Sequence, residues 1–172
     1  MKTFVISDLH FGHYAIIKHG SRPFQNTDEM DEEIIKRWNS VVSSEDTVYV
    51  LGDMFFRGVD IDSYLSRLNG DIVIIKGNHD RYFKHIKVKG FYDYKEIEVD
   101  GVKYVLSHYP MIAWNGQFRD SVHLYGHVHA SGRDWEFPKV PNAHSVCCEF
   151  HNYTPVEITK FKPVDFAKTM SI

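Results

Sequence analysis

The stretch Ile72–Asp80 reads IVIIKGNHD, and it contains the pattern from which the fold of this chain can be predicted. Its first four residues are apolar and β-branched, which is typical of a strand buried on both faces of a parallel sheet. Gly77 ends the strand, and an amide, an imidazole and a carboxylate follow at Asn78, His79 and Asp80. Ligands of open α/β sheets bind outside the carboxyl ends of the strands, so we expect function here.

Four other predicted strands run directly into side chains of the same kinds. The strands are Thr3–Ser7, Thr47–Leu51, Lys103–Ser107 and His123–Tyr125. The residues that follow them are, in the same order, Asp8-Leu9-His10, Gly52-Asp53, His108 and Gly126-His127-Val128-His129. A scatter of buried polar groups and helix caps would not recur at so many strand ends, so the pattern predicts one polar rim.

The first half of the chain alternates strands with helices. One helix begins at a cap formed by Asn26 or Thr27 and continues to Val42, and a shorter helix covers Asp60–Leu68. Both carry apolar residues at helical spacing, so each is expected to dock one face on the sheet. With the strands around them they predict a βαβαβ order with parallel strands and right-handed crossovers.

The second half is richer in strands and loops. Tyr94–Val99 and Val102–Leu106 alternate around an Asp-Gly turn and predict a hairpin, and Val146–Phe150 and Val156–Thr159 are expected as late strands. We therefore predict an α/β fold in a single domain over residues 1–172, with two β-rich halves face to face and helices outside. The loops expected at one rim are Phe11–Gln25, Met54–Val59, Tyr109–Asp120 and Ser131–His144.

Composition and charge exclude several classes of protein. The net charge of −3 provides no global field that would attract nucleic acid or an anionic membrane. No apolar run approaches the roughly 20 residues that span a bilayer, and Asp8 interrupts the N-terminal run too early for a signal peptide. Cys147 and Cys148 are adjacent, which rules out a disulfide framework and suits the reducing cytoplasm, where we expect the protein.

Candidate metal ligands follow the predicted strands. They are Asp8, His10, Asp53, Asn78, His108, His127 and His129. Residues two apart in a strand point the same way, so the first pair and the last pair can each converge on one point. Seven N and O ligands without a thiolate are too many for one tetrahedral ion and suit two adjacent ions such as Mn, Fe, Ni or Zn. Asp53 is the natural bridging ligand, because a carboxylate offers two oxygens.

Such a centre would attract phosphate. Two divalent ions with Asp8 and Asp53 keep a formal surplus of about two positive charges. Paired ions roughly 3.5–4 Å apart clamp the attacking and leaving oxygens of an in-line displacement and lower the pKa of a shared water. His79 has no obvious place among the ligands, so it is the candidate general acid, and Asp80 is the candidate carboxylate that orients its ring.

The five blocks together resemble the calcineurin-like metallophosphoesterases, over positions 8 to 129. The blocks are Asp8-Leu9-His10, Gly52-Asp53, Gly77-Asn78-His79-Asp80, His108 and Gly126-His127-Val128-His129. The resemblance implies a four-layer α/β/β/α sandwich and one metal held by Asp8, His10 and His129. It also implies a second metal held by Asn78, His108 and His127, with Asp53 as the bridge and His79 as the residue that assists catalysis.

The segment after Asp53 departs from the protein-phosphatase branch of that family. Phe56 stands where that branch has an acid, and the chain is far shorter, so it resembles the compact bacterial or phage-type phosphoesterases instead. Arg57 keeps the position at which that branch contacts phosphate, and His13 lies in the first loop. Both are candidate substrate-binding residues. Further candidates to contact phosphate are Arg22, Arg81 and Arg133, and candidate stacking or core aromatics are Phe55, Phe56, Tyr109 and Trp114.

We therefore predict a dinuclear metal-dependent phosphoesterase that hydrolyses phosphomonoesters or phosphodiesters through a metal-activated hydroxide. Manganese is the first expectation for the two divalent ions, with Fe, Zn, Ni or Mg as alternatives. The expected partner is a small phosphoester, including nucleotide-like ones, and neither a membrane nor nucleic acid is expected. The alternatives are a non-catalytic metal-binding scaffold of the same fold and a nuclease, which would favour a basic groove that the overall charge does not supply.

Overall fold

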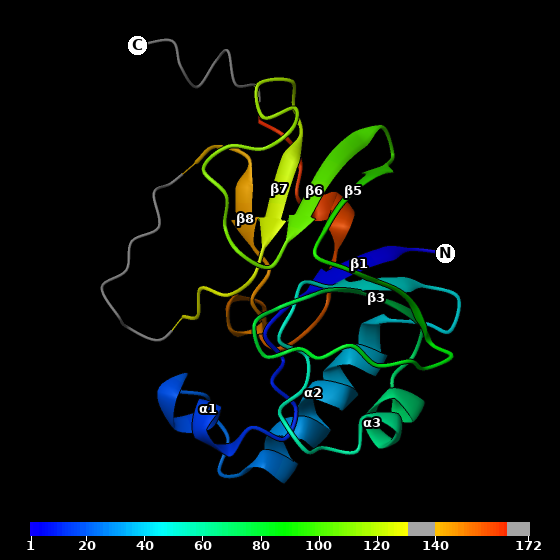
Figure 1. Ribbon diagram of the computed structural model, residues 1–172, viewed down its shortest axis with the longest axis vertical. Coiled ribbons are helices and arrows are strands. Elements are labelled where there is room, and N and C mark those ends of the chain that lie inside the picture. The colour runs from blue at the N-terminus through cyan, green and yellow to red at the C-terminus, as the bar shows by residue number, and fades with distance from the viewer. Residues whose placement is uncertain (131–139, 165–172) are drawn as a thin grey trace.

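The computed structural model describes residues 1–130 and 140–164, which form two β-sheets with helices on one side (Figure 1). The first sheet has five strands in the order β4-β3-β2-β1-β9, and the second has four in the order β5-β6-β7-β8. The strands of the first sheet are β1 (Thr3–Ile6), β2 (Thr47–Val50), β3 (Asp71–Ile75), β4 (Val88–Tyr92) and β9 (Val156–Glu157). Those of the second are β5 (Tyr94–Val99), β6 (Val102–Ser107), β7 (Val122–Tyr125) and β8 (Ala143–Ser145).

The predicted βαβαβ order of the first half is confirmed. Strands β1 to β4 are parallel, and β9 pairs antiparallel with β1 at the edge. Thr47 pairs with Thr3 on one side and with Asp71 on the other, so β1, β2 and β3 begin level with one another. Their carboxyl ends consequently meet at the same rim of the sheet, and β6 and β7, which are also parallel, end beside them.

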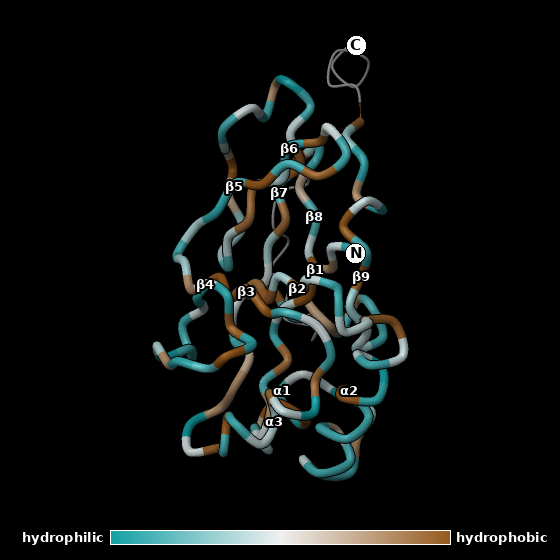
Figure 2. Tube along the Cα trace, turned by 90° about the vertical axis from the view of Figure 1, so that its right-hand side faces the viewer, coloured by the Kyte–Doolittle hydropathy of each residue, from teal (hydrophilic) through white to brown (hydrophobic). Residues whose placement is uncertain are grey.

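The helices cover one face of the first sheet (Figure 2). They are α1 (Tyr14–His19), α2 (Thr27–Val41) and α3 (Ile61–Arg67). Asn26 caps α2, because its side chain accepts a hydrogen bond from the Glu29 amide. Met30, Ile34 and Trp38 of α2 are buried in the core between the helices and the sheet, as their helical spacing predicts.

A second core lies between the two sheets. Side chains alternate along a strand, so Phe4 and Ile6 of β1 face the helices whereas Val5 faces the second sheet. Leu106 of β6 and Leu124 of β7 pack in this second core. The hairpin predicted around residues 100–101 is present as the antiparallel pair β5 and β6. The two β-rich halves therefore pack face to face as expected.

The expected four layers are only partly present. Helices, first sheet and second sheet form three layers, but in the described ranges no helix covers the outer face of the second sheet (Figure 2). The loop after β6 lies there instead. The Met111 amide donates to His123 Nε2, and the Trp114 ring lies 5.2 Å from the His123 ring between centroids. A mixed α/β fold with two sheets and few helices is thus what the structure supports.

Two elements lie in segments that were expected to be loops. Helix α1 occupies six residues of Phe11–Gln25 and buries only Ile16, so it has almost no apolar periodicity to detect. Strand β8 (Ala143–Ser145) is three residues long and begins within the last two residues of Ser131–His144. Arg133 and most of that predicted loop lie outside the described residues.

The structure has one strand that was not predicted, lacks one predicted strand, and has one that is shorter than predicted. Strand β4 was not predicted, because VKGFY is an edge strand with exposed positions and a central glycine. The predicted strand Val146–Phe150 is an isolated bridge between Ser7 and Cys147 followed by the 3₁₀ helix η1 (Cys148–His151). The predicted strand Val156–Thr159 is two residues of β9 followed by η2 (Ile158–Lys160).

Among the described helices, none is long and apolar enough to cross a membrane.

Candidate metal centre

The loops that carry the candidate ligands have an unusual backbone. Asp8, His10, Asp53 and His127 all adopt left-handed conformations, with φ of 59°, 53°, 54° and 67°. Only a few per cent of non-glycine residues do so, and such strain persists where the surrounding structure enforces it, as at functional sites. The loops hydrogen-bond to one another, for example from the Asp8 amide to the Gly52 carbonyl and from the His10 amide to the Asp53 carbonyl.

Glycines allow these loops to approach closely. A Cβ atom on Gly52 would lie 2.3 Å from His108 Nδ1, and one on Gly77 would lie 2.2 Å from Asp53 Oδ1. A Cβ atom on Gly126 would lie 2.7 Å from Asp8 Oδ2. Each of these three glycines therefore leaves space for a neighbouring candidate ligand, and Gly52, with a φ of 90°, also has a backbone conformation that favours glycine.

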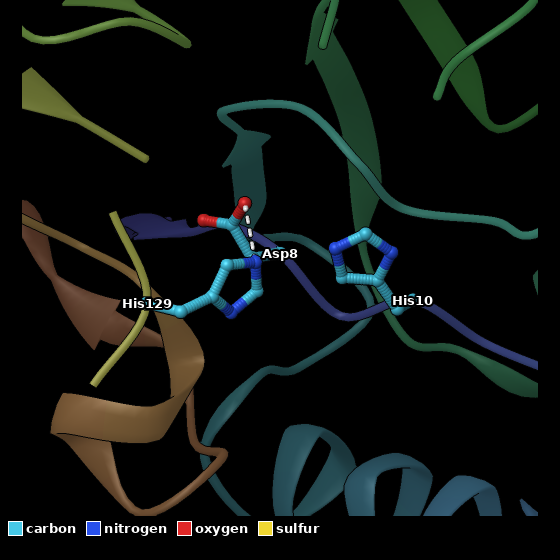
Figure 3. Close-up of side chains that lie close together, drawn as sticks. All are labelled: Asp8, His10 and His129. Atoms are coloured by element: carbon cyan, nitrogen blue, oxygen red, sulfur yellow. Dashed lines mark ion pairs between the residues drawn. The ribbon is translucent and has the colours of Figure 1, made fainter. Parts of the chain in front are cut away.

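One group of candidate ligands consists of Asp8, His10 and His129 (Figure 3). Their ligand atoms lie within 4.8 Å of one another, and His129 Nε2 is 3.8 Å from Asp8 Oδ1. His10 is 2% exposed, and its Nε2 has no hydrogen-bond partner among the described residues. A buried nitrogen without a partner is costly, and a metal ion in this group would satisfy it.

Asp53 lies between this group and a second one. Its Oδ2 is 3.7 Å from His10 Nε2 and 3.6 Å from His108 Nε2, whereas its Oδ1 accepts a hydrogen bond from the His79 amide. Asp8, Asp53 and His108 form the second group of ligand atoms within 4.8 Å of one another. One carboxylate oxygen thus faces an imidazole from each group, which is the position of a bridging ligand.

Asn78 and His127 flank the second group. Asn78 Oδ1 is 3.1 Å from His108 Nε2, and the His127 ring lies 5.1 Å from the His108 ring between centroids. His108 Nδ1 lies 2.8 Å from the Leu51 carbonyl, which can only accept, so Nδ1 carries the proton and Nε2 presents a lone pair. An amide oxygen and an imidazole lone pair that face each other are a donor set for a cation. All seven predicted ligands thus lie around one rim.

Burial shifts the pKa values of several ligands toward their neutral forms. It raises the pKa of Asp8, against the opposing effect of His129 and His108, and it strongly lowers the pKa of His10. Burial and the neighbouring His108 lower the pKa of His127. Neutral imidazoles can bind metal, and a bound cation would offset the cost of ionising the buried Asp8. The electrostatics of the site therefore fit a metal centre.

Glu149 and Arg22 lie behind the candidate ligand His129 and hold it in place. The sequence analysis did not predict this role for either residue. Glu149 Oε1 lies 2.8 Å from His129 Nδ1 and 3.0 Å from Arg22 Nε. Burial acts to lower the pKa of His129, but Glu149 and Asp8 outweigh it, and that pKa is raised. The bond directs His129 Nε2 toward Asp8. Arg22 also donates to the carbonyls of Leu9 and Asp8, so its guanidinium is buried in the fold and is not available to phosphate.

A third group of metal-type side chains is better explained by that network. His129, Cys147 and Glu149 also lie within 4.8 Å of one another. The Arg22 guanidinium is bonded to Glu149, however, and its positive charge disfavours a cation at this point. Cys147 is buried as expected, 3.9 Å from His129 Nδ1. This group therefore supports the His129 ligand rather than forming a separate site.

Asp80 does not have the expected contact with His79. Its carboxylate accepts hydrogen bonds from the backbone amides of Asp53, Met54 and Gly77, and no bond to the His79 ring is found within the described ranges. The φ of Asp53 turns its amide toward Asp80, so the carboxylate ties two ligand loops together. Burial raises the pKa of Asp80, and the three amides oppose that effect. Asp80 thus positions the loop of Asp53 rather than the ring of His79.

The other predicted site residues lie near the centre but outside the two ligand groups. His79 Nε2 is 4.0 Å from Asp53 Oδ2, and its side chain is 35% exposed. His13 Nδ1 is 3.5 Å from His10 Nδ1, and the His13 ring stacks on Phe56 at 3.8 Å between centroids.

Arg57 is exposed and lines a cavity with His79 and Arg81. Phe55 is buried in the core, whereas Tyr109 is half exposed beside His127.

The chain matches a known superfamily. Residues 1–142 match the family model described as the calcineurin-like phosphoesterase superfamily domain, and the chain belongs to that superfamily. It is 39% identical to protein MJ1445 of Methanocaldococcus jannaschii over 163 residues, covering 91% of this chain and 87% of that protein. It is also 33% identical to the Gene 66 protein of Mycobacterium phage L5 over 82 residues, covering 45% of this chain and 39% of that protein.

A solved structure supports the same assignment of the fold. The crystal structure of protein AQ665 from Aquifex aeolicus resembles this chain with a TM-score of 0.69 and 26% sequence identity. The match covers 92% of this chain and 96% of that one. The predicted family is therefore confirmed, and the chain is a member of a superfamily of phosphoester hydrolases.

Proposed function

We propose that this protein hydrolyses phosphomonoesters or phosphodiesters at a centre of two divalent metal ions. The observation that carries the proposal is Asp53 Oδ2, which lies 3.7 Å and 3.6 Å from the Nε2 atoms of His10 and His108. Manganese is the first candidate because the ligands are nitrogens and oxygens without thiolates, and Fe, Zn, Ni or Mg are the alternatives. Asp8, His10 and His129 would hold one ion and Asn78, His108 and His127 the other, with Asp53 shared.

The two ions would supply positive charge to the phosphoryl oxygens and an acidified water for attack. In hydrolysis the oxygen of water bonds to phosphorus, the bond from phosphorus to the leaving oxygen breaks, and that oxygen takes up a proton. His79 is the proposed donor of this proton, because its ring is partly exposed beside Asp53 and outside both ligand groups. The hydrogen bond from its amide to Asp53 Oδ1 holds its backbone in place.

The proposed substrate is a small phosphoester, with nucleotide-like esters among the candidates. His13 and Arg57 are the proposed contacts to it, because both lie beside the His79 ring and outside the two ligand groups. The two cysteines are buried and unpaired, so the proposal includes a reducing cytoplasmic location. The rival function is a metal-binding scaffold without catalysis, and it differs from this proposal in predicting metal uptake without turnover.

The test is hydrolysis of p-nitrophenyl phosphate and bis(p-nitrophenyl) phosphate across several divalent metals. We expect turnover with manganese, and we expect His79→Ala to reduce kcat by about 10²- to 10⁴-fold while metal content stays close to that of the wild type. His127→Ala is the contrasting variant, because it should weaken metal binding itself. Metal uptake without turnover on any ester would support the scaffold, and loss of metal from His79→Ala would overturn the role given to His79.

A further inference from the structure

Residues 81–95 form a surface unlike the rest of the chain. Between Arg81 and Lys95 there are five Lys or Arg residues and one acid, Asp93, which gives this segment a net charge of +4, whereas the whole chain carries −3. Aromatic residues alternate with these cations. They are Tyr82, Phe83, Phe91, Tyr92 and Tyr94. The mild overall charge therefore conceals a basic and aromatic segment that directly follows His79 and Asp80.

The segment surrounds a cavity of about 700 Å³ beside the edge strand β4. Its walls include Tyr82, Lys84, Ile86, Lys89, Phe91 and Tyr92. Tyr82 is 67% exposed and Ile86 is 84% exposed, and the Tyr82 ring meets the Phe91 ring edge-on at 5.5 Å between centroids. Large apolar side chains are thus held at the surface around a hollow, and they stay exposed among the residues that the structure describes.

This cavity shares a wall residue with a smaller cavity that reaches His79. Phe83 also lines a second cavity of about 90 Å³, whose wall contains Phe56, Arg57, His79 and Arg81. His79 in turn faces Asp53 of the metal centre. We call the walls of the two cavities together the basic track, since they extend from the metal centre to β4.

Arg57 and the cations of residues 81–95 differ in how they are engaged. Lys87 donates to the Leu68 carbonyl, Lys89 lies 3.4 Å from Asp71, and Lys95 Nζ lies 4.0 Å from the centre of the Tyr92 ring. Arg57, Arg81 and Lys84 have no hydrogen bond or ion pair in the part of the chain that the structure describes. These three side chains are available to bind an anion. Arg57 and Arg81 line the smaller cavity with His79, and Lys84 lines the larger one.

We propose that the basic track binds single-stranded nucleic acid and leads one of its phosphodiesters to the metal centre. This rests on the proposed phosphoesterase function and names the class of substrate. Grooves that bind single strands combine cations for the phosphates with aromatic faces on which bases stack, and the basic track has both. Its aromatic side chains wall a hollow instead of forming a flat apolar face, which favours a strand over a lipid surface. The net charge of the whole chain did not predict nucleic acid as a partner. The proposal includes it because the positive charge is concentrated in one segment of the surface.

The test measures binding of a fluorescein-labelled oligothymidylate of about ten nucleotides by anisotropy, in EDTA so that hydrolysis cannot occur. Tyr82→Ala should weaken binding at least about 5-fold through lost stacking, whereas Tyr82→Phe should bind like the wild type. Lys84→Ala should reduce the slope of log K against log salt by about 0.7. Lys36→Ala is the matched control, because Lys36 lies on α2 and its side chain is 77% exposed.

The proposal is overturned if the oligonucleotide does not bind at low salt, or if Tyr82→Ala and Lys84→Ala bind it like the wild type. Binding to phosphatidylserine vesicles without binding to the oligonucleotide would also overturn it. Hydrolysis of bis(p-nitrophenyl) phosphate by the same preparations separates the two proposals. We expect Tyr82→Ala to keep that activity and to lose turnover of the oligonucleotide. Oligonucleotide binding without any hydrolysis would refute the phosphoesterase and leave the binding surface standing.

Discussion

At the scale of residues, the site is defined by buried nitrogen and oxygen atoms that face one another beyond hydrogen-bond distance. Asp53 Oδ2 lies opposite the Nε2 atoms of both His10 and His108, and His10 Nε2 is buried without a partner among the described residues. Such an arrangement is unfavourable in a protein alone, since buried acceptors need donors. A cation bound between these atoms would satisfy the buried acceptors. It would also explain why the loops have a strained backbone and carry these side chains.

Glu149→Gln should affect one metal ion more than the other. The variant removes the charge that holds the Nδ1–H of His129 and pairs with Arg22, so the ion of the Asp8, His10 and His129 group should bind about 10- to 100-fold more weakly. Calorimetric titration of the metal-free protein with manganese would resolve this change. Circular dichroism before titration would establish that the variant is folded.

Glu33→Gln is the matched control for that prediction. Glu33 pairs with Arg37 on the surface of α2, where an ion pair contributes only about 0–1 kcal/mol. This control should bind both ions like the wild type. Equal metal affinities for Glu149→Gln and the wild type would show that the glutamate does not position His129.

At the scale of elements, the parallel strands bring residues that are distant in sequence to one rim. Each strand ends in a short turn, and the turns pack on one another through glycines. Asp80 reinforces this packing, because its carboxylate accepts from amides in two of the turns. The ligand geometry is therefore a property of adjoining turns rather than of any single motif.

Gly77→Ala should disrupt the centre without a large loss of global stability. A Cβ atom at this position would lie 2.2 Å from Asp53 Oδ1 and 2.6 Å from the Asp53 amide nitrogen, so the shared carboxylate must move. We expect turnover to fall by about 100-fold, because misplacing a positioned group by about 1 Å has effects of that size. Steady-state kinetics and metal analysis would measure the loss.

Gly101→Ala separates this effect from a general cost of replacing glycine. Gly101 has a φ of 77° in the hairpin turn between β5 and β6, and a Cβ atom there meets nothing within 4 Å. It should lower the free energy of unfolding by about 1 kcal/mol through backbone strain and leave turnover unchanged. Wild-type activity in Gly77→Ala would mean that the bridging position of Asp53 tolerates displacement.

At the scale of the whole molecule, the two sheets bury polar groups away from the rim as well. His123 of β7 is fully buried, with Nδ1 3.0 Å from the Val105 carbonyl and Nε2 accepting from the Met111 amide. Burial lowers its pKa from 6.5 to about 4. This imidazole is a packed, neutral group that holds the loop after β6.

Stability should therefore depend on pH through His123. Its folded pKa lies below its unfolded value, so the contribution is fully present above pH 6.5 and is lost as the pH falls toward 4. A shift of this size corresponds to about 3 kcal/mol. Urea unfolding of the metal-free protein at several pH values should show a flatter dependence for His123→Asn than for the wild type. The exposed His19→Gln should keep the wild-type slope, and identical slopes for all three would contradict the prediction.

The sequence alone was enough to predict the family, the βαβαβ half, the hairpin and the meeting of the seven candidate ligands at one rim. These features are local, because an apolar run, a glycine and a polar residue in order depend little on distant contacts. Strand β4 and helix α1 were missed because edge strands and six-residue helices have no strong periodicity. Glu149 was missed because its partner His129 is 20 residues away and no motif contains it.

Tertiary structure decided the rest. It assigned Asp80 to backbone amides, buried Arg22 behind the ligands, and placed Arg57 with Arg81 and His79 in the wall of one cavity. These outcomes depend on which turns lie next to one another after the strands have paired and the sheets have packed. Order along the chain determines what each strand delivers to the rim, but only three-dimensional packing determines which neighbour each side chain meets.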